Sequence, residues 1–279
     1  MKNEFKTITK NKNGKIQYLT EVLPMIPTNT ILYKKLTGLG ATYGEIKAKR
    51  NSIIIEPNKP VIIGKCNDPK HANDNLFGVC VNVFTDDIVA YLERSIKENK
   101  FINILTTPES FHKVEEALEE MDMNIRYDCF LLFDECHKIV KDSDFRPNIS
   151  LPMDLFFECR NKALVSATPL EFTDPRFEKQ NFQTITIVPT FNYVKGINLH
   201  ATNNLLQETK EVFVELNERC FIFCNSTDTI YSMMNQIGIL EESAVFCSEK
   251  SVDKLNEMKF NNATDVWDKN KMKRYNWLT

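Results

Sequence analysis

The chain of 279 residues is long enough for two domains or one large one, and its 42% of hydrophobic residues can form a sizeable core. A formal net charge of −3 disfavours a protein coated for non-specific nucleic-acid binding but permits a local basic groove. No apolar run approaches the roughly 20 residues of a membrane-spanning helix, and the polar start does not match a signal peptide, so we expect a cytoplasmic protein.

Eight cysteines are scattered along the sequence, and most of them stand inside apolar runs. They are Cys66, Cys80, Cys129, Cys136, Cys159, Cys220, Cys224 and Cys247. No two have the CxxC spacing that is typical of zinc sites. We therefore predict buried, reduced thiols rather than a cysteine-bound metal.

The first part of the chain alternates between predicted strands and helices. Residues 1–30 are polar and then rich in turn-forming residues, so we predict an entry segment with little structure of its own. Apolar, β-branched runs predict strands at 51–57, 79–85, 101–107 and 162–169, and amphipathic patterns predict helices at 86–100, 108–121 and 153–160. This alternation predicts an α/β domain with a mainly parallel sheet over residues 31–175.

A glycine-bearing turn comes early in this domain. Gly38 and Gly40 stand two residues apart and are followed by Thr42 and a charged, helical stretch. Such a turn can close its backbone N–H groups on a phosphate, and the threonine hydroxyl could complete a magnesium site. The usual phosphate-binding loop has lysine directly before that threonine, whereas this chain has Ala41. An ordinary glycine turn therefore fits as well, and Lys34 or Lys35 could reach in from the preceding residues.

The most informative stretch runs from Phe130 to His137. Four apolar residues lead directly into Asp134, Glu135, Cys136 and His137. A continuous apolar run is typical of a strand buried on both faces of a parallel sheet, and its end lies at the edge where open α/β folds bind ligands. Of two carboxylates there, one can hold a hard cation and the other can handle a proton. The alternative is a core strand that ends in a solvated acidic turn.

A second α/β unit follows a charged, turn-prone stretch at 170–182. We expect it to cover residues 176–279, with strands at 183–190, 219–226 and 243–248 and helices at 204–219, 227–238 and 253–260. The strand at 219–226 is expected to be buried. About 100 residues are few for a complete second domain, so we expect the chain to belong to a longer polypeptide.

Three of these segments stand in an order that is characteristic of one family. The glycine turn, Asp134–His137 and Ser166–Thr168 each follow a predicted strand. In this order the sequence resembles the superfamily 2 helicases and translocases, which are DEAD/DEAH-box-like ATPases with two RecA-like lobes. The three segments are similar to motif I, to motif II of the DExH type and to motif III. Residues 56–60, 106–110 and 221–225 are similar to motifs Ia, Ib and IV, so the resemblance covers about residues 31–279.

This resemblance implies a RecA-like P-loop NTPase fold, with lobe 1 at 31–175 and an incomplete lobe 2 at 176–279. It implies ATP and Mg²⁺ as cofactors and DNA or RNA as the partner. The nucleotide-binding residues would be Thr37, Gly38, Leu39, Gly40, Ala41 and Thr42, and the metal ligands Thr42 and Asp134. Glu135 would orient and deprotonate the attacking water, and His137 would link the ATP site to the second lobe. Ser166, Ala167 and Thr168 would couple the nucleotide to a nucleic-acid track formed by Pro57, Asn58, Lys59, Thr107 and Pro108.

Two departures from the family pattern leave two functions open. Ala41 removes the ammonium group that neutralises phosphate charge, and the arginine finger and threonine-rich motif V of the second lobe have no counterpart in the sequence. The first function is an ATP-dependent helicase or translocase, completed by the remainder of a longer polypeptide or by partner subunits. The alternative is a catalytically impaired RecA-like module that binds nucleotide, nucleic acid or a protein partner without hydrolysis.

Overall fold

The computed structural model describes residues 2–141, 147–193, 201–216, 221–266 and 276–278. The chain divides into two compact units, Met1–Val194 and Lys195–Thr279, and each is described by itself. None of the helices in these described ranges is long and apolar enough to cross a membrane.

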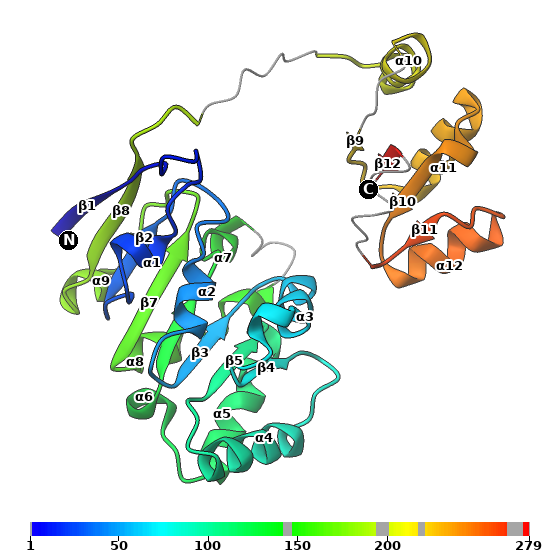
Figure 1. Cartoon of the computed structure of the whole chain (residues 1–279). Coiled ribbons are helices and arrows are strands. Elements are labelled where there is room, and N and C mark those ends of the chain that lie inside the picture. The colour runs from blue at the N-terminus through cyan, green and yellow to red at the C-terminus, as the bar shows by residue number, and fades with distance from the viewer. Residues whose placement is uncertain (1, 142–146, 194–200, 217–220, 267–275, 279) are drawn as a thin grey trace. The chain divides into compact units, whose positions relative to one another are not determined.

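The first unit is built on one parallel sheet of eight strands with helices on both faces (Figure 1). The strand order is β1-β8-β2-β7-β6-β3-β5-β4, and every paired neighbour is parallel. The strands are β1 Lys2–Ile8, β2 Thr30–Tyr33, β3 Ser52–Ile55, β4 Leu76–Val79, β5 Asn103–Thr106, β6 Phe130–Phe133, β7 Asn161–Ser166 and β8 Gln183–Pro189. This architecture confirms the predicted α/β fold class with a mainly parallel sheet.

The helices of the first unit lie between these strands in the chain. They are α1 Leu19–Val22, α2 Ala41–Ile46, α3 Lys59–Cys66, α4 Thr85–Lys97, α5 Phe111–Glu120, α6 Ile125–Asp128, α7 His137–Lys141, α8 Met153–Glu158 and α9 Pro175–Lys179. Short 3₁₀ turns occur at η1 Pro69–His71, η2 Pro108–Ser110 and η3 Pro147–Ser150. The predicted helices at 86–100, 108–121 and 153–160 correspond to α4, α5 and α8.

The central strands are buried on both faces of the sheet. In β6, Leu131 and Phe133 belong to an apolar cluster shared with α4, α5 and α8, whereas Phe130 and Leu132 belong to a cluster shared with α1, α2 and α3. All four side chains are at most 2% exposed. Burial on both faces explains why this strand is a continuous apolar run rather than an alternating one. Each such side chain contributes about 1.5–3 kcal/mol through its removal from water.

The two ends of the first unit lie in the sheet, contrary to the sequence prediction. β1 pairs with β8 along its whole length, so residues 1–30 contribute a strand and α1 instead of forming a loosely structured entry segment. β8 in turn pairs with β2, which places residues 176–194 in the first unit rather than in the second. The sequence prediction missed β1 because β1 is an edge strand. Ile8 is buried but Phe5 is 68% exposed, so this part of the sequence has no strong strand pattern.

The other edge of the sheet also differs from its prediction. The strand expected at 79–85 is β4, Leu76–Val79, which ends where the prediction began. Val81 and Phe84 are 67% and 68% exposed, so this apolar stretch lies at the surface between β4 and α4. An exposed apolar loop and a buried strand share the same composition, and periodicity does not separate them over so few residues.

The second unit has its own parallel sheet, in the order β11-β10-β12-β9. Its elements are α10 Leu205–Lys210, the π turn η4 Glu211–Glu215, β9 Phe221–Ile222, α11 Thr227–Ile237, η5 Leu240–Glu242, β10 Ser243–Phe246, α12 Glu249–Glu257, β11 Ala263–Thr264 and β12 Asn276–Leu278. A separate apolar cluster includes Ile222, Met234 and Val245. Of the buried strand predicted at 219–226, residues 219 and 220 lie outside the described residues. In the described part, β9 ends at Ile222, and Phe221 and Phe223 are 52% and 81% exposed, so this part is more exposed than expected.

Candidate active site

Three predicted motifs meet at the carboxyl ends of neighbouring strands. β2 runs into the glycine turn, β6 into Asp134–His137 and β7 into Ser166–Thr168, and β7 lies between the other two strands. Backbone hydrogen bonds extend this pairing beyond the strands, because Lys34 N donates to Ser166 O at 2.8 Å and Cys136 N donates to Val165 O at 3.0 Å. The strand order therefore places the three loops side by side.

The glycine turn after β2 needs its two glycines. Gly38 and Gly40 have φ angles of 73° and 82°, in the left-handed region that favours glycine, and Gly40 is the residue before α2. The turn begins with Leu36 N donating to Lys34 O at 2.6 Å. Thr37 and Gly38 are exposed at the turn, whereas Leu39 is buried. The predicted turn and following helix are both present, although α2 ends at Ile46.

Thr42 and Asp134 form a buried polar contact in the site. The Thr42 hydroxyl donates to Asp134 Oδ2, and the two residues are 7% and 2% exposed. The Glu135 backbone N donates to the other carboxylate oxygen, Oδ1, at 2.9 Å. A hydroxyl and a carboxylate held together suit a hard cation such as Mg²⁺, which takes oxygen ligands. The two residues predicted to hold the metal therefore lie together and fit that ion chemically.

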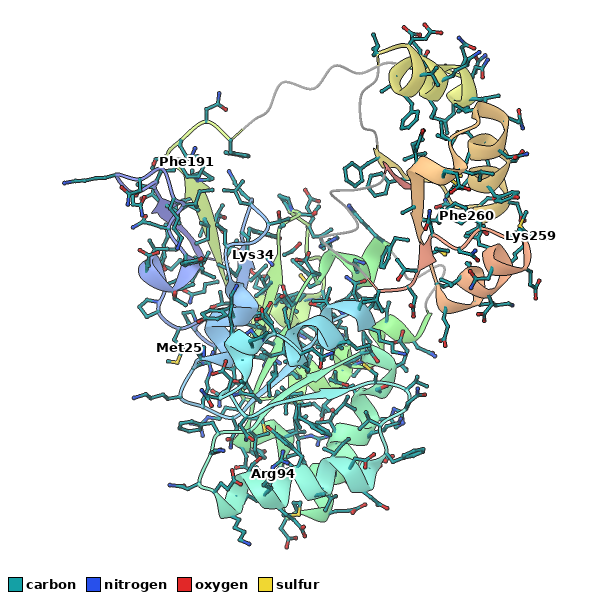
Figure 2. All side chains as sticks on the ribbon, turned by 45° about the vertical axis from the view of Figure 1, so that its right-hand side comes forward. Met25, Lys34, Arg94, Phe191, Lys259 and Phe260 are labelled. Carbon is teal, nitrogen blue, oxygen red and sulfur yellow. The ribbon has the colours of Figure 1, made fainter. Side chains whose placement is uncertain are left out.

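Lys34, which is labelled in Figure 2, provides a buried positive charge beside the two acids. Its Nζ lies 3.2 Å from Asp134 Oδ1 and 3.0 Å from Glu135 Oε1, and the residue is 6% exposed. Burial alone would lower the pKa of Lys34, but the charges and hydrogen bonds of the two acids outweigh burial and raise it. Burial opposes ionisation of Asp134 as well, yet the charge of Lys34 and the hydrogen bond from Thr42 hold the pKa of Asp134 below its usual value.

Position 41 contributes only a methyl group. Ala41 is 3% exposed and belongs to the apolar cluster that also contains Leu19 and Leu39. The residue that departs from the family pattern is therefore part of the core. Of the two lysines proposed as substitutes from the sequence, Lys34 points inward to the acids and Lys35 is exposed.

Glu135, His137 and Ser166 form a chain of contacts between the second and third motifs. His137 Nδ1 lies 3.3 Å from Glu135 Oε2 and 3.0 Å from Ser166 Oγ. The Ser166 hydroxyl donates to Thr168 O at 2.7 Å and accepts from Thr168 N at 3.0 Å. Because the hydroxyl proton is already donated, the serine oxygen is left to accept from a protonated His137 Nδ1. Ala167 lies half-buried within the Ser166–Thr168 turn.

Glu135 has an unusual backbone conformation for its residue type. Its φ of 49° lies in the left-handed region, which costs a non-glycine residue of the order of 1–3 kcal/mol. Its side chain is 25% exposed, in contrast to the buried Asp134. The two neighbouring carboxylates therefore differ in access to solvent, as expected if one holds a cation and the other handles a proton.

A third carboxylate at this edge was predicted only as part of the motif Ia segment at 56–60, and not as a site residue. Glu56 follows β3, is 2% exposed, and accepts a hydrogen bond from Asn58 N at 3.2 Å. Burial, followed by the charge of Asp134, raises the pKa of Glu56 to about 7. Lys65 Nζ lies 3.9 Å from Glu56 Oε2. The available signal was an acid directly after an apolar strand, the same pattern that marks Asp134.

The predicted nucleic-acid track surrounds a surface hollow of about 620 Å³. Four of its five residues line the hollow: Pro57, Asn58, Lys59 and Thr107. Pro108 is instead buried in the first position of η2. His112 and Lys113 of α5 also line the hollow and were missed, although they closely follow the track residues in the sequence. Lys138 Nζ of α7 donates to Asn58 Oδ1 at 2.8 Å and so connects the second motif to this surface.

The fold is a RecA-like α/β fold, with a mainly parallel sheet flanked by helices. No protein-family model matches the sequence, and no curated protein matches it. The chain is similar to a Saccharomyces cerevisiae Dbp5 variant bound to a Gle1 variant and IP6, with a TM-score of 0.52 and 12% identity over 95% of this chain and 68% of that one.

Two further solved structures are similar at lower TM-scores. A DEAD box protein from the hyperthermophile Methanococcus jannaschii has a TM-score of 0.41 and 13% identity, over 90% of this chain and 68% of that one. A hypothetical ATP-dependent RNA helicase from Sulfolobus tokodaii has a TM-score of 0.39 and 13% identity, over 90% of this chain and 72% of that one. At these identities the similarity concerns the fold.

Proposed function

We propose that this chain is an ATP-dependent nucleic-acid helicase or translocase of superfamily 2, which couples hydrolysis of ATP to movement on DNA or RNA. The observation that carries the proposal is the acid pair at the end of β6. Asp134 is buried against Thr42 of the glycine turn, and Glu135 is partly exposed and contacts His137, whose ring contacts Ser166. An ordinary acidic turn would leave both carboxylates in water.

The roles of the residues follow from their contacts. Thr42 and Asp134 would hold Mg²⁺, which supplies charge neutralisation at the phosphates when it is bound. Glu135 would orient a water molecule and accept its proton, since its carboxylate is accessible and lies next to the metal ligands. His137 and Ser166 would pass changes at Glu135 to the turn that contains Thr168, through the contacts described above.

The alternative is a RecA-like module that binds without hydrolysis. Ala41 favours it, because its methyl group packs in the core and provides no charge for the phosphates. Against it stands the arrangement of the two acids. Lys34 and Thr42 pair the buried carboxylate of Asp134, and a module that does not hydrolyse ATP has no need of the accessible Glu135 carboxylate beside it. The cytoplasmic location stays a prediction from the sequence.

Mg-ATP turnover with and without single-stranded DNA or RNA tests the proposal. We expect ATP turnover to rise when the correct nucleic acid is added. Comparison of DNA with RNA then identifies which of the two is the partner. If neither this chain nor a longer polypeptide that contains it binds Mg-ATP or shows stimulated turnover, the proposal is wrong. Binding without turnover in both would favour the alternative module.

The nucleic-acid surface has a test of its own. Lys59 is exposed at the first position of α3 and lines the hollow, so we expect it to contact a phosphate. Lys59→Ala should weaken binding about equally for different sequences and lower the slope of log K against log salt by about 1. Lys12→Ala, an exposed lysine after β1, is the matched control and should leave the slope unchanged. Equal slopes for both variants would exclude Lys59 from the surface.

A further inference from the structure

The position of Lys34 differs from that of the other buried lysine among the described residues. Lys162, at 3% exposure, donates to the backbone oxygens of Phe157 and Cys159 and so satisfies its charge with neutral acceptors. Lys34 instead contacts two carboxylates at the carboxyl edge of the sheet. It also stands directly before the glycine turn, and its own backbone O accepts the first hydrogen bond of that turn. Its charge is therefore placed where a ligand of that turn would lie.

A polyphosphate bound by this turn needs a positive charge from the protein. The edge already holds Asp134, Glu135 and Glu56, so phosphate oxygens would enter a region of concentrated negative charge. Phosphoryl groups are recognised by ammonium or guanidinium groups that form charge-assisted hydrogen bonds. Position 41, where such loops carry their lysine, contributes a buried methyl group. Lys65 Nζ lies 3.9 Å from Glu56 Oε2, and its charge also acts on Asp134, though less than that of Lys34.

We propose that Lys34 supplies the ammonium group for the nucleotide phosphates that position 41 lacks. The inference rests on the proposed function, since it requires that the turn bind a nucleotide. In the structure, Asp134 and Glu135 hold the Lys34 side chain beside the turn and so keep the charge in place before a nucleotide arrives. Compared with the family pattern, the lysine would thus stand directly after β2 instead of at the start of α2. Thr42 and the two acids stand where that pattern has them.

The rival explanation is that Lys34 only neutralises the buried acids. Such a lysine would matter for folding but would not contact a phosphate. A labelling reaction on the unmodified chain distinguishes the two roles. An amine that contacts the terminal phosphates of ATP reacts with an acyl group attached to those phosphates. An ATP derivative with an acyl group on its γ-phosphate transfers that group to a neighbouring lysine, and peptide mass spectrometry identifies the residue.

We expect this probe to acylate Lys34 and excess ATP to suppress the reaction. Lys35 adjoins Lys34 in the chain but is exposed, and its acylation, if any, should not respond to ATP. ATP-sensitive acylation at another lysine, with Lys34 unmodified, would overturn the inference while leaving the proposed function intact. Absence of ATP-sensitive acylation together with absence of Mg-ATP binding would overturn both.

A pair of variants provides the second measurement. Lys34→Met alone would leave two unpaired acids and could prevent folding, so it is combined with Glu135→Gln, which removes one of those charges. Relative to Glu135→Gln, the double variant should bind Mg-ATP about 10- to 100-fold more weakly, the effect of one charge-assisted hydrogen bond. Circular dichroism establishes whether both variants are folded. If the double variant is unfolded, the labelling experiment on the unmodified chain tests the inference instead.

The control is Lys35→Asn in the same Glu135→Gln background. Asparagine tolerates the left-handed φ of 54° at this position, so the substitution removes a neighbouring charge without straining the turn. We expect its affinity for Mg-ATP to stay within about threefold of the parent, since an exposed charge is screened by solvent. Unchanged affinity in the Lys34 variant would contradict the inference, and failure of the Glu135→Gln parent to bind Mg-ATP would contradict the proposed function as well.

Discussion

Glu56 makes the stability of the first unit depend on pH. Its pKa is raised from 4.5 to about 7 in the folded chain, so the folded state binds this proton more tightly than the unfolded state. The stabilising effect of protonation is fully present below pH 4.5 and is lost as the pH rises towards 7. At higher pH the buried charge costs about 3 kcal/mol, from 1.36 kcal/mol per pKa unit.

Glu56→Gln should therefore raise the free energy of unfolding by about 3 kcal/mol at pH 8 and by about 1 kcal/mol or less at pH 5. Urea unfolding of both proteins at the two pH values measures this difference. Glu119→Gln on α5 is the control, because Glu119 is exposed, and it should change the free energy by less than about 0.5 kcal/mol. If the two proteins differed in free energy of unfolding by the same amount at both pH values, the buried charge of Glu56 would not be the cause of the difference.

The residues that lie together in the site were partly predictable. Thr42 and Asp134 come after β2 and β6, and Ser166 ends β7. Each of these strands contains an apolar run, and parallel strands bring their carboxyl ends to one edge. The inward position of Lys34 was not predictable, because Lys34 and Lys35 are adjacent and chemically identical in the sequence. Which of the two is buried depends on the pairing of Lys34 N with Ser166 O, a contact between residues far apart in the chain.

Among the elements, β1 contributes more to the first unit than its sequence suggests. Ile8 is fully buried at the end of this strand, and its backbone O accepts from Thr190 N at 3.0 Å. Ile8→Ala should lower the free energy of unfolding by about 2–5 kcal/mol, as expected for truncation of a buried isoleucine. Phe5→Ala on the same strand is the control and should change it by less than about 0.5 kcal/mol, since Phe5 is 68% exposed.

Thermal or urea unfolding of the two variants measures the role of β1. If Ile8→Ala were as stable as Phe5→Ala, β1 would not be an integral strand of the sheet.

The pairing of β1 with β8 also explains why the sequence prediction missed both strands as parts of this unit. Central strands can be predicted from their continuous apolar runs, whereas an edge strand with one solvated face has only a weak sequence pattern. The partner of an edge strand can also come from a distant part of the chain, as β8 does for β1.

At the scale of the whole molecule, the chain consists of two α/β units, the first with two apolar clusters and the second with one. The α/β class was predictable because strands and helices alternate, and parallel sheets follow from that order. The boundary was not, because the charged stretch at 170–182 resembles a linker although α9 and β8 return the chain to the first sheet. Every residue proposed for binding and hydrolysis lies in the first unit, and the assignment of residues 195–279 to a second lobe stays a proposal.

The proposed hydrolysis of ATP at the acid pair after β6 is tested most directly by Glu135→Gln. Turnover of Mg-ATP with saturating single-stranded nucleic acid is compared with the affinity for Mg-ATP in the same two proteins. We expect turnover by the unmodified chain, or by the longer polypeptide that contains it, and a loss of about 10²–10⁴-fold in the variant with affinity for Mg-ATP retained. Equal turnover by both proteins, or no binding of Mg-ATP by either, would contradict the proposed hydrolysis.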